Sequence, residues 1–145
     1  MTKRITIVAM VLLMLMPRTA MAHPGLTREL IDAIRQVESG GNDNAVGDGG
    51  RAIGPYQIHE DYWKDAIEFE PSIGGRYEDC FKREYAEQIV RAYINRYAPR
   101  NATPEQIAKI HNGGPGALKA KPGTTYFENL RKYWRKVEHV LRGGR

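Results

Sequence analysis

The apolar residues of this chain recur at helical spacing in several separate stretches. In the first stretch they lie three or four positions apart, at Leu26, Leu30, Ile34 and Val37. Residues with this spacing share one face of an α-helix, so the pattern predicts an amphipathic helix over residues 28–37. Thr27 is a suitable N-cap, and Gly40 and Gly41 follow the last apolar position.

A segment rich in glycine, asparagine and aspartate follows, from Gly41 to Ile58. Only a short piece over residues 52–58 alternates between apolar and polar side chains. Because this composition favours turns over extended strands, we expect irregular structure here with at most a small hairpin. A short helix is expected next, over residues 60–67.

The strongest periodicity in the chain places an apolar or aromatic residue at every fourth position, at Phe81, Tyr85, Ile89, Tyr93 and Tyr97. Val90 and Ile94 widen this apolar stripe. A broad stripe is typical of a helix that packs against other elements along one side. We therefore expect a long helix that passes through the core.

Two more helices are predicted in the last third of the chain. Thr103-Pro104-Glu105-Gln106 provides an N-cap, a proline at the first helical position and a glutamine at the third, and Gly113-Gly114-Pro115 ends this helix. A last helix should begin near Thr125, with Glu128 completing a capping box. Its apolar positions are Phe127, Leu130, Trp134, Val137 and Leu141.

The first 22 residues have the three parts of a secretory signal peptide. Lys3 and Arg4 precede an apolar run over residues 5–16, and Ala20-Met21-Ala22 has the pattern that signal peptidase reads. The run is too short to span a bilayer comfortably, which takes about 20 residues. We therefore expect a signal peptide over residues 1–22 and export to the periplasm or the medium. The alternative is an uncleaved amino-terminal anchor.

The predicted mature chain, residues 23–145, is long enough for one domain with one core and too short for two. The signal peptide contains three basic residues and no acid, so its removal lowers the net charge from +5 to +2. A balance this small does not indicate a nucleic-acid-binding protein. The basic carboxy-terminal end, residues 131–145, is typical of a solvated helix face, and it would also suit an anionic cell-wall polymer.

The cysteines and histidines of the chain indicate whether it is a disulfide-stabilised or a metal-binding protein. Cys80 is the only cysteine, so no internal disulfide can form and the apolar core must hold the domain together. We expect it to be a small buried residue rather than a nucleophile. His59-Glu60 begins like the zinc motif HExxH, but Trp63 stands in place of its second histidine. The remaining histidines show no ligand spacing, so we expect no metal site.

Glu38 is the first candidate for chemistry, because it lies where the first predicted helix runs into Ser39-Gly40-Gly41. A carboxyl group at a helix C-terminus faces the negative end of the helix dipole, which favours its protonated form. A general acid needs that form. The alternative interpretation is an exposed acidic residue at a helix end.

Four short motifs follow one another along the predicted mature chain: Glu38-Ser39-Gly40, Gly54-Pro55-Tyr56-Gln57-Ile58 with Tyr62-Trp63 and Asp65, His111-Asn112-Gly113-Gly114-Pro115, and Tyr133-Trp134. In this order they resemble the motifs of the invertebrate-type lysozymes, the destabilase family. The resemblance implies an α+β, mainly α, lysozyme-like fold with a small irregular β and turn region after the helix that carries Glu38. The animal members are rich in disulfides, so this chain resembles a cysteine-poor, bacterial member.

The resemblance also implies a muramidase, which cleaves the β-1,4 bond between N-acetylmuramic acid and N-acetylglucosamine in peptidoglycan without a cofactor. Glu38 takes the place of the general acid, which protonates the glycosidic oxygen. A second carboxylate then forms a covalent intermediate or stabilises the transition state. Asp48 is the closest match to that residue and Asp43 is the reserve candidate. Gly47-Asp48-Gly49-Gly50 is also an obvious turn, so a purely structural Asp48 is the alternative.

Substrate contacts are expected from Tyr56, Gln57, His111 and Asn112. Amphipathic rings and side-chain amides suit sugars, because they offer an apolar face together with hydrogen bonds to hydroxyl and acetamido groups. The competing interpretation is structural, with Tyr56 facing inward and His111-Asn112-Gly113 forming a helix C-terminus. The expected partners are peptidoglycan glycan strands, and neither nucleic acid nor, after signal cleavage, a membrane.

Two rivals to the muramidase interpretation stay open. Glu38-Ser39-Gly40-Gly41-Asn42 and Asn112-Gly113-Gly114-Pro115-Gly116-Ala117 also resemble motifs of lytic transglycosylases, which cut the same bond with a single glutamate and leave a 1,6-anhydro ring. The segment from Tyr56 to Asp65 fits the lysozyme pattern better. The second rival is a lysozyme-like protein that binds cell walls without activity.

Overall fold

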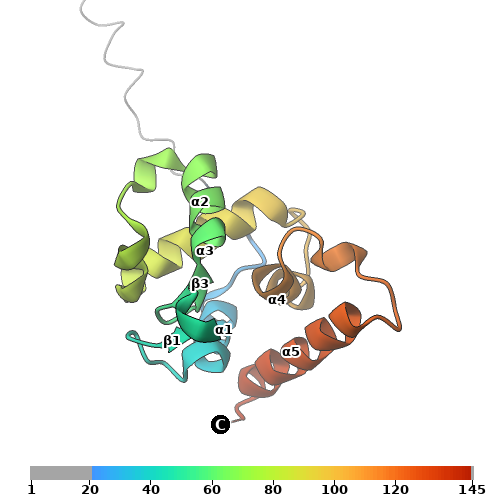
Figure 1. Cartoon of the computed structure of the whole chain (residues 1–145). Coiled ribbons are helices and arrows are strands. Elements are labelled where there is room, and N and C mark those ends of the chain that lie inside the picture. Colours follow the sequence, from blue (N-terminus) through green and yellow to red (C-terminus); the bar gives the residue numbers. More distant parts are fainter. Residues whose placement is uncertain (1–20, 145) are drawn as a thin grey trace, which may run out of the picture.

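The structure is a computed structural model that describes residues 21–144, so residues 1–20 of the predicted signal peptide lie outside the described part. Between residues 21 and 144 the chain forms helices and a small sheet that lies at one side of the molecule, next to α1 (Figure 1). In chain order the elements are α1 (Arg28–Ser39), β1 (Val46–Gly47), η2 (Asp48–Gly50), β2 (Ala52–Ile53), β3 (Ile58–His59), α2 (Glu60–Phe69), η3 (Pro71–Ile73), η4 (Tyr77–Phe81), α3 (Arg83–Tyr97), α4 (Pro104–Gly113), η5 (Ala117–Lys119) and α5 (Thr125–Leu141), where η marks a 3₁₀ helix.

The predicted helices are present, and two of the predicted N-caps have the expected geometry. The Thr27 hydroxyl accepts a hydrogen bond from the amide of Leu30 at 3.2 Å. At the start of α4, Thr103 accepts from the amide of Gln106, and the Gln106 side chain accepts from the amide of Thr103 at 2.9 Å. These bonds satisfy amides that have no partner within their own helix, and they fix where α1 and α4 begin.

The N-cap of α5 differs from the prediction by one residue. Thr124, rather than Thr125, accepts the capping hydrogen bond, at 3.2 Å. The Thr124 hydroxyl also donates to the carbonyl of Lys121 at 2.7 Å, so the preceding turn selects this threonine. Glu128 is then one position too far along the helix for a capping box, and it pairs with Arg131 instead, at 3.1 Å.

The predicted apolar stripes of α3 and α5 are largely buried, with exceptions at their ends. Phe81 lies in η4, before α3 begins. In α5 the buried residues are Leu130, Tyr133 and Val137, while Leu141 is exposed. Because α5 packs against both α1 and α4, its buried face depends on where those two helices lie as well as on apolar spacing.

A three-stranded antiparallel sheet in the order β1-β2-β3 replaces the turns and small hairpin expected after α1. Val46 lies opposite Ile53, which in turn lies opposite Ile58. Gly54, in the turn after β2, has a φ of 76° and packs so closely on the Cys80 backbone that a side chain would collide with the Cys80 carbonyl. This close approach holds the sheet against η4.

The core is formed by the facing sides of the helices. Helix α3 packs against α2 and α4, and α5 packs against α1 and α4. The largest side chains with less than 2% exposure are Tyr56, Leu30, Ile31, Ile34, Ile58, Ile89, Ile94, Ile107, Ile110, Leu130, Val90 and Val137. Within residues 21–144, none of the helices has both the length and the apolar character of a bilayer-spanning segment.

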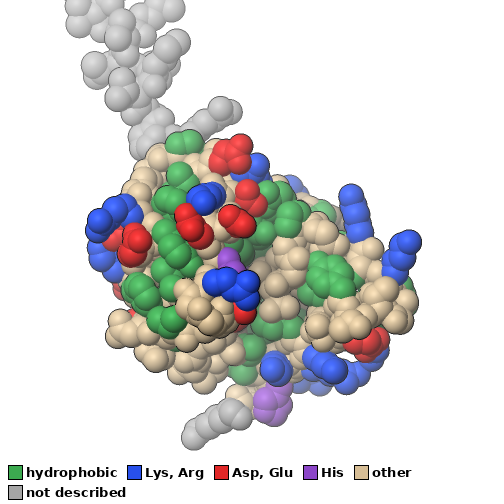
Figure 2. All heavy atoms as spheres, in the orientation of Figure 1, with side chains coloured by type: hydrophobic (Ala, Val, Ile, Leu, Met, Phe, Trp, Pro, Cys, Tyr) green, Lys and Arg blue, Asp and Glu red, His purple; other side chains and the backbone are tan. Residues whose placement is uncertain are grey.

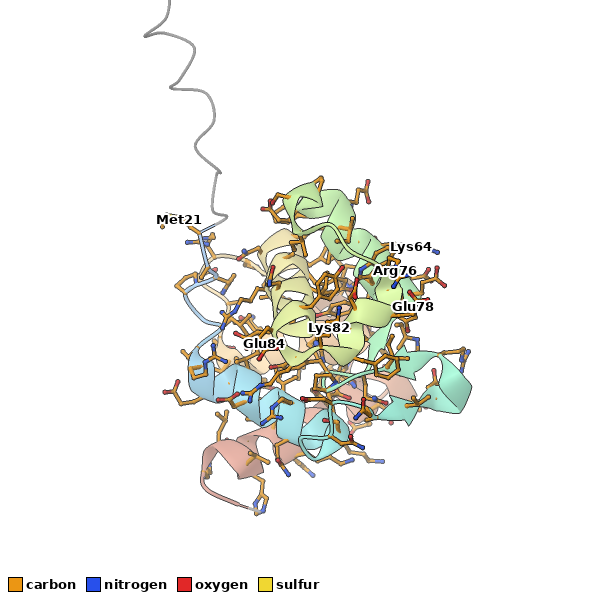
Figure 3. All side chains as sticks on the ribbon, turned by 90° about the vertical axis from the view of Figure 1, so that its left-hand side faces the viewer. Met21, Lys64, Arg76, Glu78, Lys82 and Glu84 are labelled. Carbon is orange, nitrogen blue, oxygen red and sulfur yellow. The ribbon has the colours of Figure 1, made fainter. Side chains whose placement is uncertain are left out.

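Charged side chains cover much of the surface. In the view of Figure 2, lysine and arginine side chains gather along the lower edge, where α5 lies in Figure 1. Figure 3 shows the side formed by α2, η4 and α3, where Lys64, Arg76, Glu78, Lys82 and Glu84 are at the surface. Exposed charges like these contribute little to stability, so the core and the helix contacts carry the fold.

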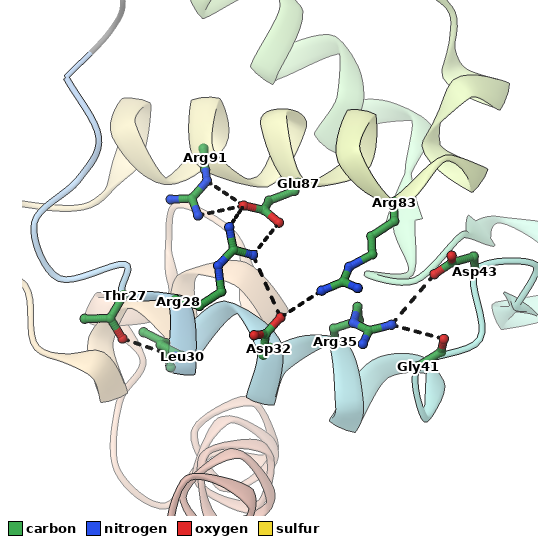
Figure 4. A network of polar contacts seen from close by, with 10 residues as sticks. All are labelled: Thr27, Arg28, Leu30, Asp32, Arg35, Gly41, Asp43, Arg83, Glu87 and Arg91. Atoms are coloured by element: carbon green, nitrogen blue, oxygen red, sulfur yellow. Dashed lines mark hydrogen bonds and ion pairs between the residues drawn. The ribbon is translucent and has the colours of Figure 1, made fainter.

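One partly buried ion-pair network joins α1 to α3 (Figure 4). The guanidinium of Arg28 makes two hydrogen bonds to the carboxylate of Glu87, at 2.8 and 2.9 Å, and Arg91 bonds the same carboxylate at 2.7 Å. Burial opposes ionisation of Glu87, but these hydrogen bonds outweigh it and lower its pKa. The network therefore stabilises the contact between α1 and α3 at neutral pH, and this contribution is lost on acidification.

Cys80 is fully buried in η4, and burial raises its pKa to about 12. At pH 8 the thiolate fraction in the folded protein is then about 10³-fold below that of an unfolded chain. We expect a thiol reagent to label Cys80 very slowly in the native protein and rapidly in denaturant, which absorbance of the released chromophore would measure. Rapid stoichiometric labelling without denaturant would contradict the buried position.

Candidate active site

A cleft of about 440 Å³ lies between the small sheet, the end of α1 and the end of α4. Five of the six residues predicted for the site line it, and Tyr56 is the exception. The lining residues are Glu38, Asp48, Ala52, Gln57, His59, Tyr62, Tyr93, His111, Asn112 and Gly114. The two predicted carboxylates therefore face the same cavity.

Glu38 lies in the last turn of α1, and its side chain is only 16% exposed. The hydroxyl of Tyr133, in α5, donates to its Oε1 atom at 2.7 Å. The Nε2 atom of His111, at the end of α4, lies 3.4 Å from the same oxygen. Three helices thus hold one carboxyl group at the edge of the cleft.

The residues after Glu38 fix the end of α1 against the turn between β2 and β3. Gly40 adopts a left-handed conformation, with φ 62°, and ends the helix. The Ser39 hydroxyl lies 2.9 Å from the carbonyl of Pro55 and 3.1 Å from that of Arg35. The Glu-Ser-Gly motif therefore combines the general-acid candidate, a hydroxyl that contacts the Pro55 turn and a glycine that ends the helix.

His111 lines the cleft, but its side chain is nearly buried and contacts the general-acid candidate. Its side chain is 3% exposed, and its Nδ1 atom lies 3.0 Å from the Tyr62 hydroxyl. The Tyr62 ring stacks on Tyr93, with ring centroids 3.5 Å apart. Burial raises the pKa of the Tyr62 and Tyr133 hydroxyls well above their usual range, so both phenols stay protonated at neutral pH.

Asp48 lies in η2 with a φ of 50°, a conformation that aspartate tolerates better than most residues. Its Oδ1 atom accepts a hydrogen bond from Arg51 at 2.8 Å, and its Oδ2 atom lies 3.4 Å from Nε2 of His59. Asp48 is 44% exposed, so its carboxylate is open to a ligand in the cleft.

Asp43, the reserve candidate, is not part of the cleft lining. It faces Arg35, with 3.8 Å between the closest oxygen and nitrogen atoms, and the same guanidinium donates to the carbonyl of Gly41 at 3.1 Å (Figure 4). These contacts fix the loop that follows α1. The geometry therefore favours Asp48 over Asp43 as the second carboxylate.

The prediction that Tyr56 contacts substrate needs correction. Its side chain is completely buried in the core, and its hydroxyl has no hydrogen-bond partner among residues 21–144. The strands on either side are only two residues long, so alternation along the chain did not indicate which way this ring faces. The inward-facing alternative holds for Tyr56.

Gln57 lines the cleft, but its amide nitrogen is already engaged within the protein. It donates to the carbonyls of Ala45 and Gly54, at 3.3 and 3.0 Å, and so joins the two ends of the loop that carries Asp48. Oε1 is the atom of Gln57 that stays available to a sugar hydroxyl. Asn112 is exposed at the opposite side of the site, and its whole amide is available to a ligand.

Replacing Gln57 by glutamate should destabilise the fold by about 1–3 kcal/mol. A carboxylate would repel two carbonyl oxygens, each of which would lose its side-chain donor and keep only a backbone one. Chemical denaturation would measure the free energy of unfolding. Gln106→Glu is the matched control: Gln106 acts as an acceptor in its capping box, and glutamate accepts equally well. Equal stability of the two variants would contradict the role given to Gln57.

Four residues at or behind the cleft were not predicted as site residues: His59, Tyr62, Tyr93 and Tyr133. Tyr62 and Tyr133 stood in the motifs that carry the family resemblance, but no local signal gave them a role. Tyr93 was one member of an apolar helical stripe. Their proximity to Glu38 or Asp48 depends on contacts between distant parts of the chain.

Comparisons with known proteins agree on one family. The Destabilase family profile matches residues 27–139. A lysozyme from Magallana gigas is 36% identical over 91 residues, which cover 59% of this chain and 58% of the relative. Lysozyme 1 from Crassostrea virginica is 33% identical over 91 residues, covering 60% of this chain and 44% of the relative. The chain thus spans about half the length of these curated relatives.

A similar solved structure is the crystal structure of Tapes japonica lysozyme, with a TM-score of 0.63 and 25% sequence identity. The match covers 82% of this chain and 95% of that lysozyme. It therefore includes nearly the whole of the solved protein, in contrast to the shorter sequence matches.

Proposed function

Because the chain belongs to the destabilase family of invertebrate-type lysozymes and has their mainly helical α+β fold, we propose that it is a glycosidase that cleaves peptidoglycan. Both the family and the fold agree with the expectation from the sequence. The observation that supports the activity best is that Glu38 and Asp48 line one cleft. Most glycoside hydrolases use two carboxyl groups that flank the bond to be cleaved.

In the proposed reaction, Glu38 acts as general acid on the oxygen that links N-acetylmuramic acid to N-acetylglucosamine. Protonation turns this oxygen into a better leaving group, and positive charge develops on the sugar ring. Asp48 stabilises that charge or forms a covalent intermediate. The side chain of Glu38 is largely shielded and that of Asp48 is more exposed, which gives the two groups different environments, as their different roles require.

The rest of the cleft suits a carbohydrate. The exposed amide of Asn112 and the free oxygen of Gln57 are placed for hydrogen bonds to hydroxyl or acetamido groups. The stacked rings of Tyr62 and Tyr93 add an aromatic surface next to these polar groups. Sugars combine polar edges with apolar faces, so this lining favours a glycan over a purely apolar ligand.

Incubation of purified peptidoglycan with the protein tests this proposal. Turbidity should fall, and mass spectrometry of the soluble fragments should show reducing muramic ends, because water completes the reaction. Fragments with 1,6-anhydro ends would instead identify a lytic transglycosylase. Binding without soluble fragments would identify a cell-wall-binding protein without activity.

We also propose that the protein is exported and acts as a domain beginning at His23. The His23 side chain is buried, its Nε2 lies 2.8 Å from the carbonyl of Pro99, and its Nδ1 accepts a hydrogen bond from the amide of Gly25. Cleavage just before this residue would leave the anchor of the folded domain intact. Amino-terminal sequencing of the exported protein should begin at His23, and retention of residues 1–22 would contradict this.

A further inference from the structure

We propose that Tyr133 and His111 are positioning residues that keep the acidic proton of Glu38 on its Oε2 atom, the oxygen left free for the glycosidic bond. This inference rests on the proposed function, in which Glu38 is the general acid. It follows from a chain of contacts that joins four helices: the Tyr133 hydroxyl in α5, Glu38 in α1, His111 in α4 and the Tyr62 hydroxyl in α2.

Tyr133 donates a hydrogen bond to the carboxyl group of Glu38. Its hydroxyl is 2.7 Å from Oε1 of Glu38, and the side chain is nearly buried behind the carboxyl group. Burial and the neighbouring charge of Glu38 hold the pKa of Tyr133 well above its usual range, so the phenol acts as a donor. Oε1 accepts this hydrogen bond and therefore does not carry the proton in that contact.

His111 is the second residue close to the same oxygen of Glu38. The Tyr62 hydroxyl lies 3.0 Å from Nδ1 of His111, and burial also holds the pKa of Tyr62 well above its usual range. When Tyr62 donates to Nδ1, the neutral imidazole carries its hydrogen on Nε2. Nε2 lies 3.4 Å from Oε1 of Glu38, so the ring presents a second N–H group to the same oxygen.

One hydrogen bond to Oε1 and the nearby ring of His111 leave Oε2 as the site of the proton in neutral Glu38. Among residues 21–144, Oε2 has no hydrogen-bond partner, and Glu38 lines the cleft. In the proposed step the bond between Oε2 and its hydrogen breaks and its electron pair stays on Glu38. The proton forms a covalent bond to the glycosidic oxygen through a lone pair of that oxygen. The glycosidic oxygen also takes the electron pair of the carbon–oxygen bond that breaks.

The hydrogen bond from Tyr133 and the proximity of the His111 ring act more strongly after the proton has left. Glu38 is then a largely shielded carboxylate, and hydrogen bonds to a charged acceptor are stronger than those to a neutral one. Tyr133 and His111 therefore stabilise the transition state more than the ground state, which raises kcat rather than substrate affinity. A residue that only filled space behind Glu38 would have no such preference.

Tyr133→Phe tests the proposal, because it removes one oxygen atom and keeps the ring in the core. We expect kcat on a soluble peptidoglycan fragment to fall about 10-fold with KM unchanged. The alkaline limb of the pH profile should move to higher pH, since ionised Glu38 loses a hydrogen bond. Tyr62→Phe, which removes the donor to His111, should lower kcat about 3-fold.

Tyr97→Phe is the matched control. Its hydroxyl donates to the carboxylate of Asp65 at 2.8 Å, the same kind of contact at a site outside the cleft lining. This variant should keep the native kcat and pH profile. Thermal unfolding of each variant shows whether it is folded at the assay temperature.

Unchanged kcat and pH profile in folded Tyr133→Phe would overturn the positioning role and leave the proposed function intact. A rise in KM alone would also overturn it, because that result describes a substrate contact. If Glu38→Gln kept full activity, Glu38 would not be the general acid, and if the native protein released no fragments from peptidoglycan, the proposed function itself would fail. The three results are distinguishable.

Discussion

Glu38→Gln should lower the rate of peptidoglycan cleavage by about 10³-fold or more, because the amide has no acidic proton to give to the glycosidic oxygen. The substitution is nearly isosteric, and the glutamine oxygen can still accept a hydrogen bond from Tyr133. We therefore expect a folded protein that still binds insoluble peptidoglycan. Release of reducing ends measures the rate, and a pull-down with the insoluble polymer measures binding.

The matched control for this variant is Glu84→Gln. Glu84 lies on the exposed side of α3, away from the cleft (Figure 3), so its replacement should leave the rate unchanged. Near-native activity in Glu38→Gln would rule out Glu38 as the general acid. Loss of both activity and binding, with the fold preserved, would instead give Glu38 a role in holding the substrate.

Asp48→Asn should lower the rate by about 10²- to 10³-fold, because the developing positive charge on the sugar loses its carboxylate. Asparagine tolerates the left-handed conformation of this turn almost as well as aspartate. The lost pair with Arg51 is exposed, so the free energy of unfolding should change by less than about 1 kcal/mol. Initial rates and chemical denaturation measure the two quantities.

Asp43→Asn separates the two candidates for the second carboxylate. Asp43 is not part of the cleft lining and faces Arg35, so this variant should retain activity. The reverse result, with loss at Asp43 and not at Asp48, would make Asp43 the second carboxylate. If neither substitution lowered the rate while Glu38→Gln did, a single-carboxylate transglycosylase would be the better assignment, and the products should then have anhydro ends.

Local features of the fold were predictable because their causes are close in sequence. The capping box at Thr103 and Gln106 and the N-cap at Thr27 depend on residues three positions apart, and both are as expected. The N-cap of α5 was wrong by one residue, because two adjacent threonines are equally good caps and the turn at Lys121 selects one.

The site was predictable in outline but not in detail. Ordered motifs indicated Glu38, Asp48, Gln57, His111 and Asn112, and these residues do line one cleft. The motifs could not assign their contacts, however. The nearly buried side chain of His111 contacts Glu38, and the amide nitrogen of Gln57 joins two ends of a loop.

The amino-acid sequence by itself determined the helices, the helix stop after Glu38 and the family, since these depend on spacing and on short motifs. Only the tertiary structure decided that Tyr56 is buried and that Tyr133 reaches Glu38 across 95 positions of the chain. Packing between distant helices sets both outcomes, because the direction of a side chain depends on how its element lies against its neighbours. No local pattern encodes that relation.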